Sequence, residues 1–121
     1  MTDIQLENEL LQKITSFDEY VQNKKISIDE GIYSFLSDFG IFLRDAISNN
    51  EKLIVKQSFD LMNSWFSYND IELEKKISVG ILEVLTDTEE SQTACINNLN
   101  SRGVAIFNNL FDRFTKLYTD P

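Results

Sequence analysis

Histidine is absent from this sequence of 121 residues, and cysteine and proline occur once each. Histidine is the commonest general base and metal ligand in proteins, so its absence excludes a Ser-His-Asp arrangement and the Glu-x-x-His pairs of helical two-metal sites. The residue spacing of an EF-hand calcium loop is absent as well. We therefore expect no catalytic, metal-binding or cofactor-binding residues, and we expect the chain not to be an enzyme.

The one cysteine, Cys95, has no second cysteine to pair with, which excludes an intramolecular disulfide and indicates a reducing compartment. Between Ala94 and Ile96 it is expected to be a buried, unreactive thiol. The N-terminal residues are acidic and amphipathic, unlike a signal peptide, and no apolar run reaches the roughly 18 residues of a membrane span. We expect a cytoplasmic protein that makes no contact with a membrane.

Positive charge is scarce, because 11 Lys and Arg residues face 20 Asp and Glu residues and the formal net charge is −9. Hydrophobic residues still make up 42% of the chain and include nine Phe, which excludes a disordered chain and predicts one packed domain over residues 1–121. A field of this sign repels nucleic acid and anionic membranes and attracts a basic macromolecule. The expected partner is therefore basic, and neither nucleic acid nor a small-molecule substrate is expected.

Four glycines and a single proline, Pro121, leave few interruptions, and apolar residues recur at steps of three and four along the chain. This period predicts an all-α domain of about six helices joined by short connectors, arranged as three antiparallel αα-hairpins. A HEAT-like stack and a compact bundle fit the pattern equally well. The apolar stripes lie within residues 10–21, 32–47, 54–66, 73–85, 94–99 and 104–118.

Local signals place the boundaries of these helices. Ser27 and Glu30 form a capping-box pair, Asp70 suits an N-cap, and Ser101 is expected to cap the last helix. Residues 77–81 also alternate like a strand, but no second strand is available to pair with them, so a helix is expected. Gly40 and Gly80 lie inside helical stretches, where a close approach of two helices is their simplest explanation.

Some acidic residues have a basic residue four positions along the chain, as in Glu9–Lys13, Glu72–Lys76 and Asp112–Lys116. These pairs are expected to be solvated ion pairs with a structural role. Other acids have no such neighbour. Five of them lie close to expected helix N-termini, where helix capping and solubility are an alternative explanation: Asp29, Glu30, Asp87, Glu89 and Glu90. The unopposed acids are Asp29, Glu30, Asp38, Glu83, Asp87, Glu89 and Glu90.

Two tyrosines lie among acids: Tyr33 follows Glu30, and Tyr68 precedes Asp70. Aromatic side chains beside carboxylates can anchor a basic protein partner while the charges steer it. The residues predicted to bind the partner are Asp29, Glu30, Tyr33, Tyr68, Asp70, Glu72, Glu83, Asp87, Glu89 and Glu90.

Three runs, FLSDFGIFL at 35–43, FDLMN at 59–63 and ISVGILEVL at 77–85, resemble a group of small, uncharacterised, all-helical bacterial proteins. This group is similar to the immunity proteins of contact-dependent growth inhibition and related toxin systems. The resemblance implies an immunity protein that binds a cognate basic toxin, expected to be a nuclease domain, and occludes its active site. The alternative is a helical adaptor that binds a protein partner without inhibiting it.

Overall fold

A computed structural model of the protein describes residues 1–26 and 30–119, with side chains up to Arg113. The described residues are helical and contain no strand, which confirms the predicted all-α class. They form seven helical segments, one more than expected, when the continuous run α5–η2–α6 is counted once. The elements are α1 (Asp3–Lys13), α2 (Thr15–Lys24), α3 (Ile32–Ser48), α4 (Lys52–Phe66), α5 (Ile71–Ile77), η2 (Ser78–Leu82), α6 (Glu83–Leu85), α7 (Glu89–Asn98) and α8 (Ser101–Thr119).

The additional helix arises at Ile14, which is both the C-cap of α1 and the N-cap of α2. The apolar stripe of this region was expected to form a single helix, but it belongs to two helices that meet at a bend. Leu10, Ile14 and Phe17 remain fully buried on both sides of that bend. Helix α1 begins earlier than its stripe, at a capping box between Thr2 and Gln5.

The remaining boundaries follow local capping. Asn49 is the C-cap of α3, and Asn50 after it has a left-handed φ of 55°. Asp70 caps α5 by accepting a hydrogen bond from the Leu73 N–H at 3.2 Å. The cap of α8 is Asn100 rather than the expected Ser101, because the Gly103 N–H donates to the Asn100 carboxamide oxygen at 2.9 Å. Ser27 lies outside the described residues, and α3 begins after Gly31.

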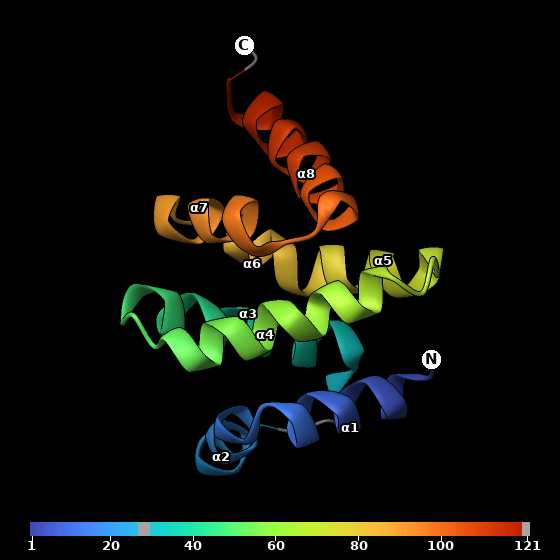
Figure 1. Ribbon diagram of the computed structural model, residues 1–121, viewed down its shortest axis with the longest axis vertical. Helices are drawn as coiled ribbons and strands as arrows, with labels where there is room; N and C mark the ends of the chain where they lie inside the picture. The colour runs from blue at the N-terminus through green and yellow to red at the C-terminus, as the bar shows by residue number, and fades with distance from the viewer. Residues whose placement is uncertain (27–29, 120–121) are drawn as a thin grey trace.

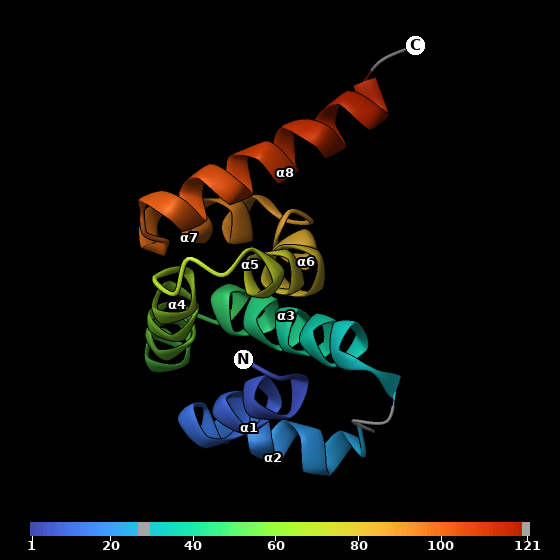
Figure 2. The ribbon, with the colours of Figure 1, turned by 90° about the vertical axis from the view of Figure 1, so that its right-hand side faces the viewer.

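Helix α3 occupies the middle of the molecule (Figures 1 and 2). Helices α1 and α2 lie on one side of it, the run α5–η2–α6 crosses its other side, and α4 packs along it. Helix α7 follows beyond α6, and the C-terminal part of α8 extends away from the other helices. Within the described residues, none of the helices combines the length and apolar character needed to cross a membrane.

Two glycines allow α3 and the run α5–η2–α6 to cross closely, as predicted. A Cβ placed on Gly80 would lie 2.5 Å from Leu36 Cβ, and one on Gly40 would lie 3.0 Å from Val84 Cβ. Gly80 lies in a π-helical turn, η2, which the apolar period does not reveal. The crossing of these two helices therefore depends on the absence of side chains at both positions.

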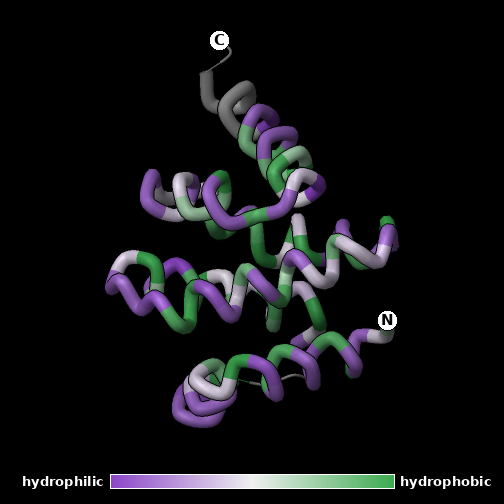
Figure 3. The backbone as a smooth tube through the Cα atoms, in the orientation of Figure 1, coloured by the Kyte–Doolittle hydropathy of each residue, from purple (hydrophilic) through white to green (hydrophobic). Residues whose placement is uncertain are grey.

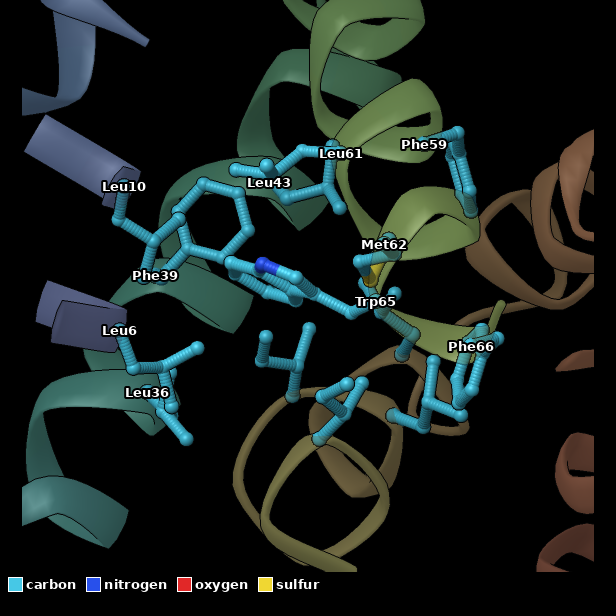
Figure 4. Packing of buried hydrophobic residues seen from close by; sticks show 14 of the residues in the cluster. Leu6, Leu10, Leu36, Phe39, Leu43, Phe59, Leu61, Met62, Trp65 and Phe66 are labelled. Carbon is cyan, nitrogen blue, oxygen red and sulfur yellow. The ribbon is translucent and has the colours of Figure 1, made fainter. Parts of the chain in front are cut away.

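The core is continuous across these helices. Green and purple positions alternate along the tube in Figure 3, as expected for helices with one buried face. Trp65 of α4 is completely buried and points toward Phe39 and Leu43 of α3 (Figure 4). Cys95 of α7 is also completely buried, and burial raises the pKa of its thiol to about 12, as expected for an unreactive cysteine.

Helix α8 is held at its start by polar contacts. Arg102 donates two hydrogen bonds to the buried carboxylate of Glu74, from Nε at 3.1 Å and from a terminal nitrogen at 2.8 Å. The Asn63 side chain also joins α4 to the α7–α8 connector, accepting from the Asn100 N–H at 2.8 Å. These bonds fix the first turn of α8 to the body of the protein.

Candidate functional site

The ion pairs of the described residues differ from those expected from local spacing. Lys76 pairs with Asp3 at 2.7 Å, although Glu72 was the expected partner. The hydrogen bond that Lys76 donates to Asp3 is the main cause of the raised pKa of Lys76, and burial acts against it. No ion pair joins Glu9 to Lys13 in the described part of the chain. The side chain of Lys116, the expected partner of Asp112, lies outside the described residues.

Asp87 is not an unopposed acid, because Arg44 of α3 donates a hydrogen bond to its carboxylate at 3.1 Å. Glu83 lies partly buried on α6, where desolvation raises its pKa and the positive charge of Arg113 lowers it by a smaller amount. Both acids therefore have a basic residue from a distant part of the chain close by. Sequence spacing could not reveal either neighbour.

The other predicted residues fall into separate regions. Glu89 and Glu90 are exposed in the first turn of α7, whereas Tyr68, Asp70 and Glu72 lie around the start of α5. Figure 1 shows these two starts at opposite sides of the molecule. The run α5–η2–α6 separates them by about 20 Å at the usual rise per residue. The predicted residues therefore do not form one compact surface.

Tyr68 lies between two adjoining hollows that separate α1 from α4. Glu9, Lys13 and Tyr68 line both hollows, which measure about 660 and 460 Å³. Asp70 lines the larger one, and the Tyr68 side chain is 56% exposed. We refer to these hollows together as the Tyr68 groove, and two of the predicted residues thus meet there.

Tyr33 is 43% exposed and lies close enough to Lys76 to affect its pKa. It therefore faces the side of α3 that is next to α5. Asp29, its other expected neighbour, lies outside the described residues. The expected group of Asp29, Glu30 and Tyr33 is consequently not shown as one cluster.

A different set of acids follows α3 on the side that faces α2. Asp38 and Asp45 are two helical turns apart and share this side, and Glu30 precedes them just before the helix begins. We call these three residues the α3 acidic row. In the described part of the chain none of the three takes part in an ion pair, and Arg44 next to Asp45 is directed to Asp87 instead.

Tyr20 and Phe42 lie beside this row, with their ring centroids 5.2 Å apart. Desolvation is the main cause of a raised pKa of Asp38, and the negative charge of Glu30 adds to it. Desolvation also raises the pKa of Tyr20, followed by the charges of Asp38 and Asp45. Lys24 lies over the Tyr20 ring, 5.7 Å from its centroid. The row is thus a place where like charges act on one another beside partly buried aromatic rings.

Glu30 belongs to the predicted set, but Asp45 and Tyr20 were not identified from the sequence. The seven-residue spacing of Asp38 and Asp45 was the available signal for one shared helix face. Among the described residues, no group of three or more His, Cys, Asp or Glu side chains could hold a metal ion.

These features define a small, acidic, all-helical domain. A family model described as a domain of unknown function, DUF7674, matches residues 7–100. This match spans more than half of the chain, so the protein belongs to that family. Helix α8 begins just after the matched stretch. No curated protein and no solved structure matches the chain.

Proposed function

We propose that this protein is a non-enzymatic binding protein whose partner is a basic protein. The α3 acidic row is the observation that carries the proposal. Like charges held together on a folded surface repel one another, and the charge of Glu30 adds to the desolvation that raises the pKa of Asp38. Lysine and arginine side chains of a partner would remove this repulsion by neutralising the row.

The row also has the other features of a protein interface. Tyr20 and Phe42 supply aromatic surface that a partner can cover, and the carboxylates around them supply a polar rim. The net charge of −9 adds a long-range field that accelerates the encounter with a basic molecule. The partner would therefore be steered by the whole molecule and held at α3.

In its finer form, the proposal is that the protein is a cytoplasmic immunity protein. Its partner would be a toxin with a basic active-site cleft, a nuclease, whose lysines and arginines normally hold phosphate groups. The acidic row would occupy those side chains and cover the active site. The resemblance of residues 35–43, 59–63 and 77–85 to helical immunity proteins supports this form of the proposal.

Co-expression tests this function. A basic toxin domain encoded beside the gene should kill cells alone and should be tolerated when this protein is present. The purified pair should form a complex in titration calorimetry. The double variant Asp38→Asn/Asp45→Asn should lose affinity and rescue. The matched variant Glu89→Gln/Glu90→Gln removes the same charge from the first turn of α7 and should retain both.

Two outcomes would contradict the finer form. Rescue without a detectable complex would exclude occlusion as the mechanism. A complex that leaves the toxin active would favour the adaptor, which also binds a partner but does not inhibit it.

A further inference from the structure

The Tyr68 groove has a composition suited to an extended peptide. Helices α1 and α4 face each other across it, and amide side chains line its walls, among them Asn8, Gln12 and Gln57. Side-chain amides both donate and accept hydrogen bonds, so they can pair with the exposed N–H and C=O groups of a peptide backbone. A helical peptide would not offer these groups, because its own hydrogen bonds use them.

The charges of the groove favour a peptide with a positive net charge. Glu9 and Asp60 line the smaller hollow, Glu9 and Asp70 line the larger one, and Lys13 is the one basic side chain among the residues that line them. Lys56 lies outside this lining and pairs with Asp60 at 2.6 Å. Even when the paired Asp60 is left out, the two acids Glu9 and Asp70 outnumber the single base Lys13 in the lining. The whole chain has a net charge of −9.

Tyr68 supplies the contact that distinguishes a basic side chain from a neutral one. Tyr68 is 56% exposed, and it lines both hollows together with Glu9. A lysine or arginine side chain lying on such a ring is attracted by the π-electrons and by the nearby carboxylate together. Lys13 lines the same two hollows, and its positive charge would repel that side chain.

We propose that the Tyr68 groove binds an extended, basic peptide segment, with one lysine or arginine side chain lying on Tyr68 beside Glu9. This inference rests on the proposed function in one respect, namely that the segment belongs to the basic partner protein. It adds a second contact region to the α3 acidic row, and the positive charge of Lys13 would oppose binding at this second region.

The test uses a synthetic peptide of alternating glycine and arginine, which has no tendency to form a helix, with the full-length protein. Amide chemical-shift changes should concentrate on α1 and on the end of α4 around Tyr68. A basic peptide of equal charge with a helix-forming, alanine-rich sequence should bind more weakly. Tyr68→Ala should raise the Kd about three- to fivefold, the amount expected for an exposed cation–π contact. Tyr33→Ala removes an exposed tyrosine elsewhere and should leave the Kd unchanged.

Two charge variants should act in opposite directions. Glu9→Gln should raise the Kd, whereas Lys13→Gln should lower it, each about two- to threefold. The controls Glu51→Gln and Lys52→Gln make the same charge changes at the start of α4, away from the groove, and should have smaller effects. A Kd that depends only on net charge, or shifts confined to the α3 acidic row, would overturn the inference. Chemical-shift changes confined to the α3 acidic row would contradict peptide binding at the groove but not the proposed function. Absence of a toxin partner would contradict the immunity function but not peptide binding at the groove.

Discussion

Gly80 of η2 and Leu36 of α3 face each other without space for a side chain between them, since a Cβ on Gly80 would lie 2.5 Å from Leu36 Cβ. Gly80→Ala should therefore destabilise the protein by about 1–3 kcal/mol, the usual cost of overpacking a core. The higher helix propensity of alanine offsets this by about 1 kcal/mol at most. Urea denaturation measures the change in the free energy of unfolding.

Gly40→Ala provides a graded comparison, because its added Cβ would lie 3.0 Å from Val84 Cβ. It should destabilise less than Gly80→Ala, since the Val84 side chain has less distance to move. A Gly80→Ala variant as stable as the wild type would show that the crossing of the two helices can widen freely.

Cys95 should resist alkylation in the folded protein. Burial raises the pKa of its thiol from 9.0 to about 12, so the reactive thiolate is about a thousandfold rarer at neutral pH. Modification by iodoacetamide should be correspondingly slow and should become fast after unfolding in urea. Mass spectrometry over time gives both rates, and rapid modification of the folded protein would contradict the buried position of Cys95.

The helices of this protein could be predicted from the apolar period because each has one continuous buried face. The bend at Ile14 could not, since the buried stripe continues through it from Leu10 to Phe17 and neither glycine nor proline marks it. The π-helical turn at Gly80 was hidden for a related reason. It changes the register of one turn without changing which side chains are apolar.

The surface charges were less predictable because their partners come from distant parts of the chain. Asp3 precedes Lys76 by 73 positions and Arg44 precedes Asp87 by 43, so spacing along a helix could not identify either pair. The effect extends to the candidate site. Because Arg44 is directed to Asp87, it forms no ion pair with Asp45 in the described residues, and Asp38 and Asp45 both lie close enough to Tyr20 to raise its pKa, which only the folded arrangement shows.

Asp38 should oppose folding at neutral pH. Its pKa is raised in the folded state, first by desolvation and then by Glu30, so the ionised form is less favourable there than in the unfolded chain. This cost is present above the folded-state pKa and disappears as the pH falls below the ordinary value of 3.8. Asp38→Asn should therefore stabilise the protein at pH 7.

Thermal unfolding from pH 3 to pH 8 measures this effect, and the difference between variant and wild type should shrink at the acidic end. Asp60→Asn is the control with the opposite sign, because Asp60 pairs with Lys56 at 2.6 Å and loses a favourable contact. A destabilised Asp38→Asn protein would mean that Asp38 has a favourable structural role, and the argument for the α3 acidic row would fail with it.

Association with the basic partner should separate steering from contact. Reversing Glu89 and Glu90 to lysine changes the net charge by four at an exposed helix start and should lower the on-rate through the long-range field. Asp38→Asn/Asp45→Asn changes the charge by only two, yet it should raise the off-rate as well, because these residues lie beside the aromatic contact of Tyr20 and Phe42. Stopped-flow association and dissociation across a salt series distinguish the two effects.

The wild-type on-rate should approach about 10⁸ M⁻¹s⁻¹ at low salt and should fall steeply as the ionic strength rises. If the Asp38→Asn/Asp45→Asn variant dissociates at the wild-type rate, α3 steers the partner without touching it, and the contact surface must lie elsewhere.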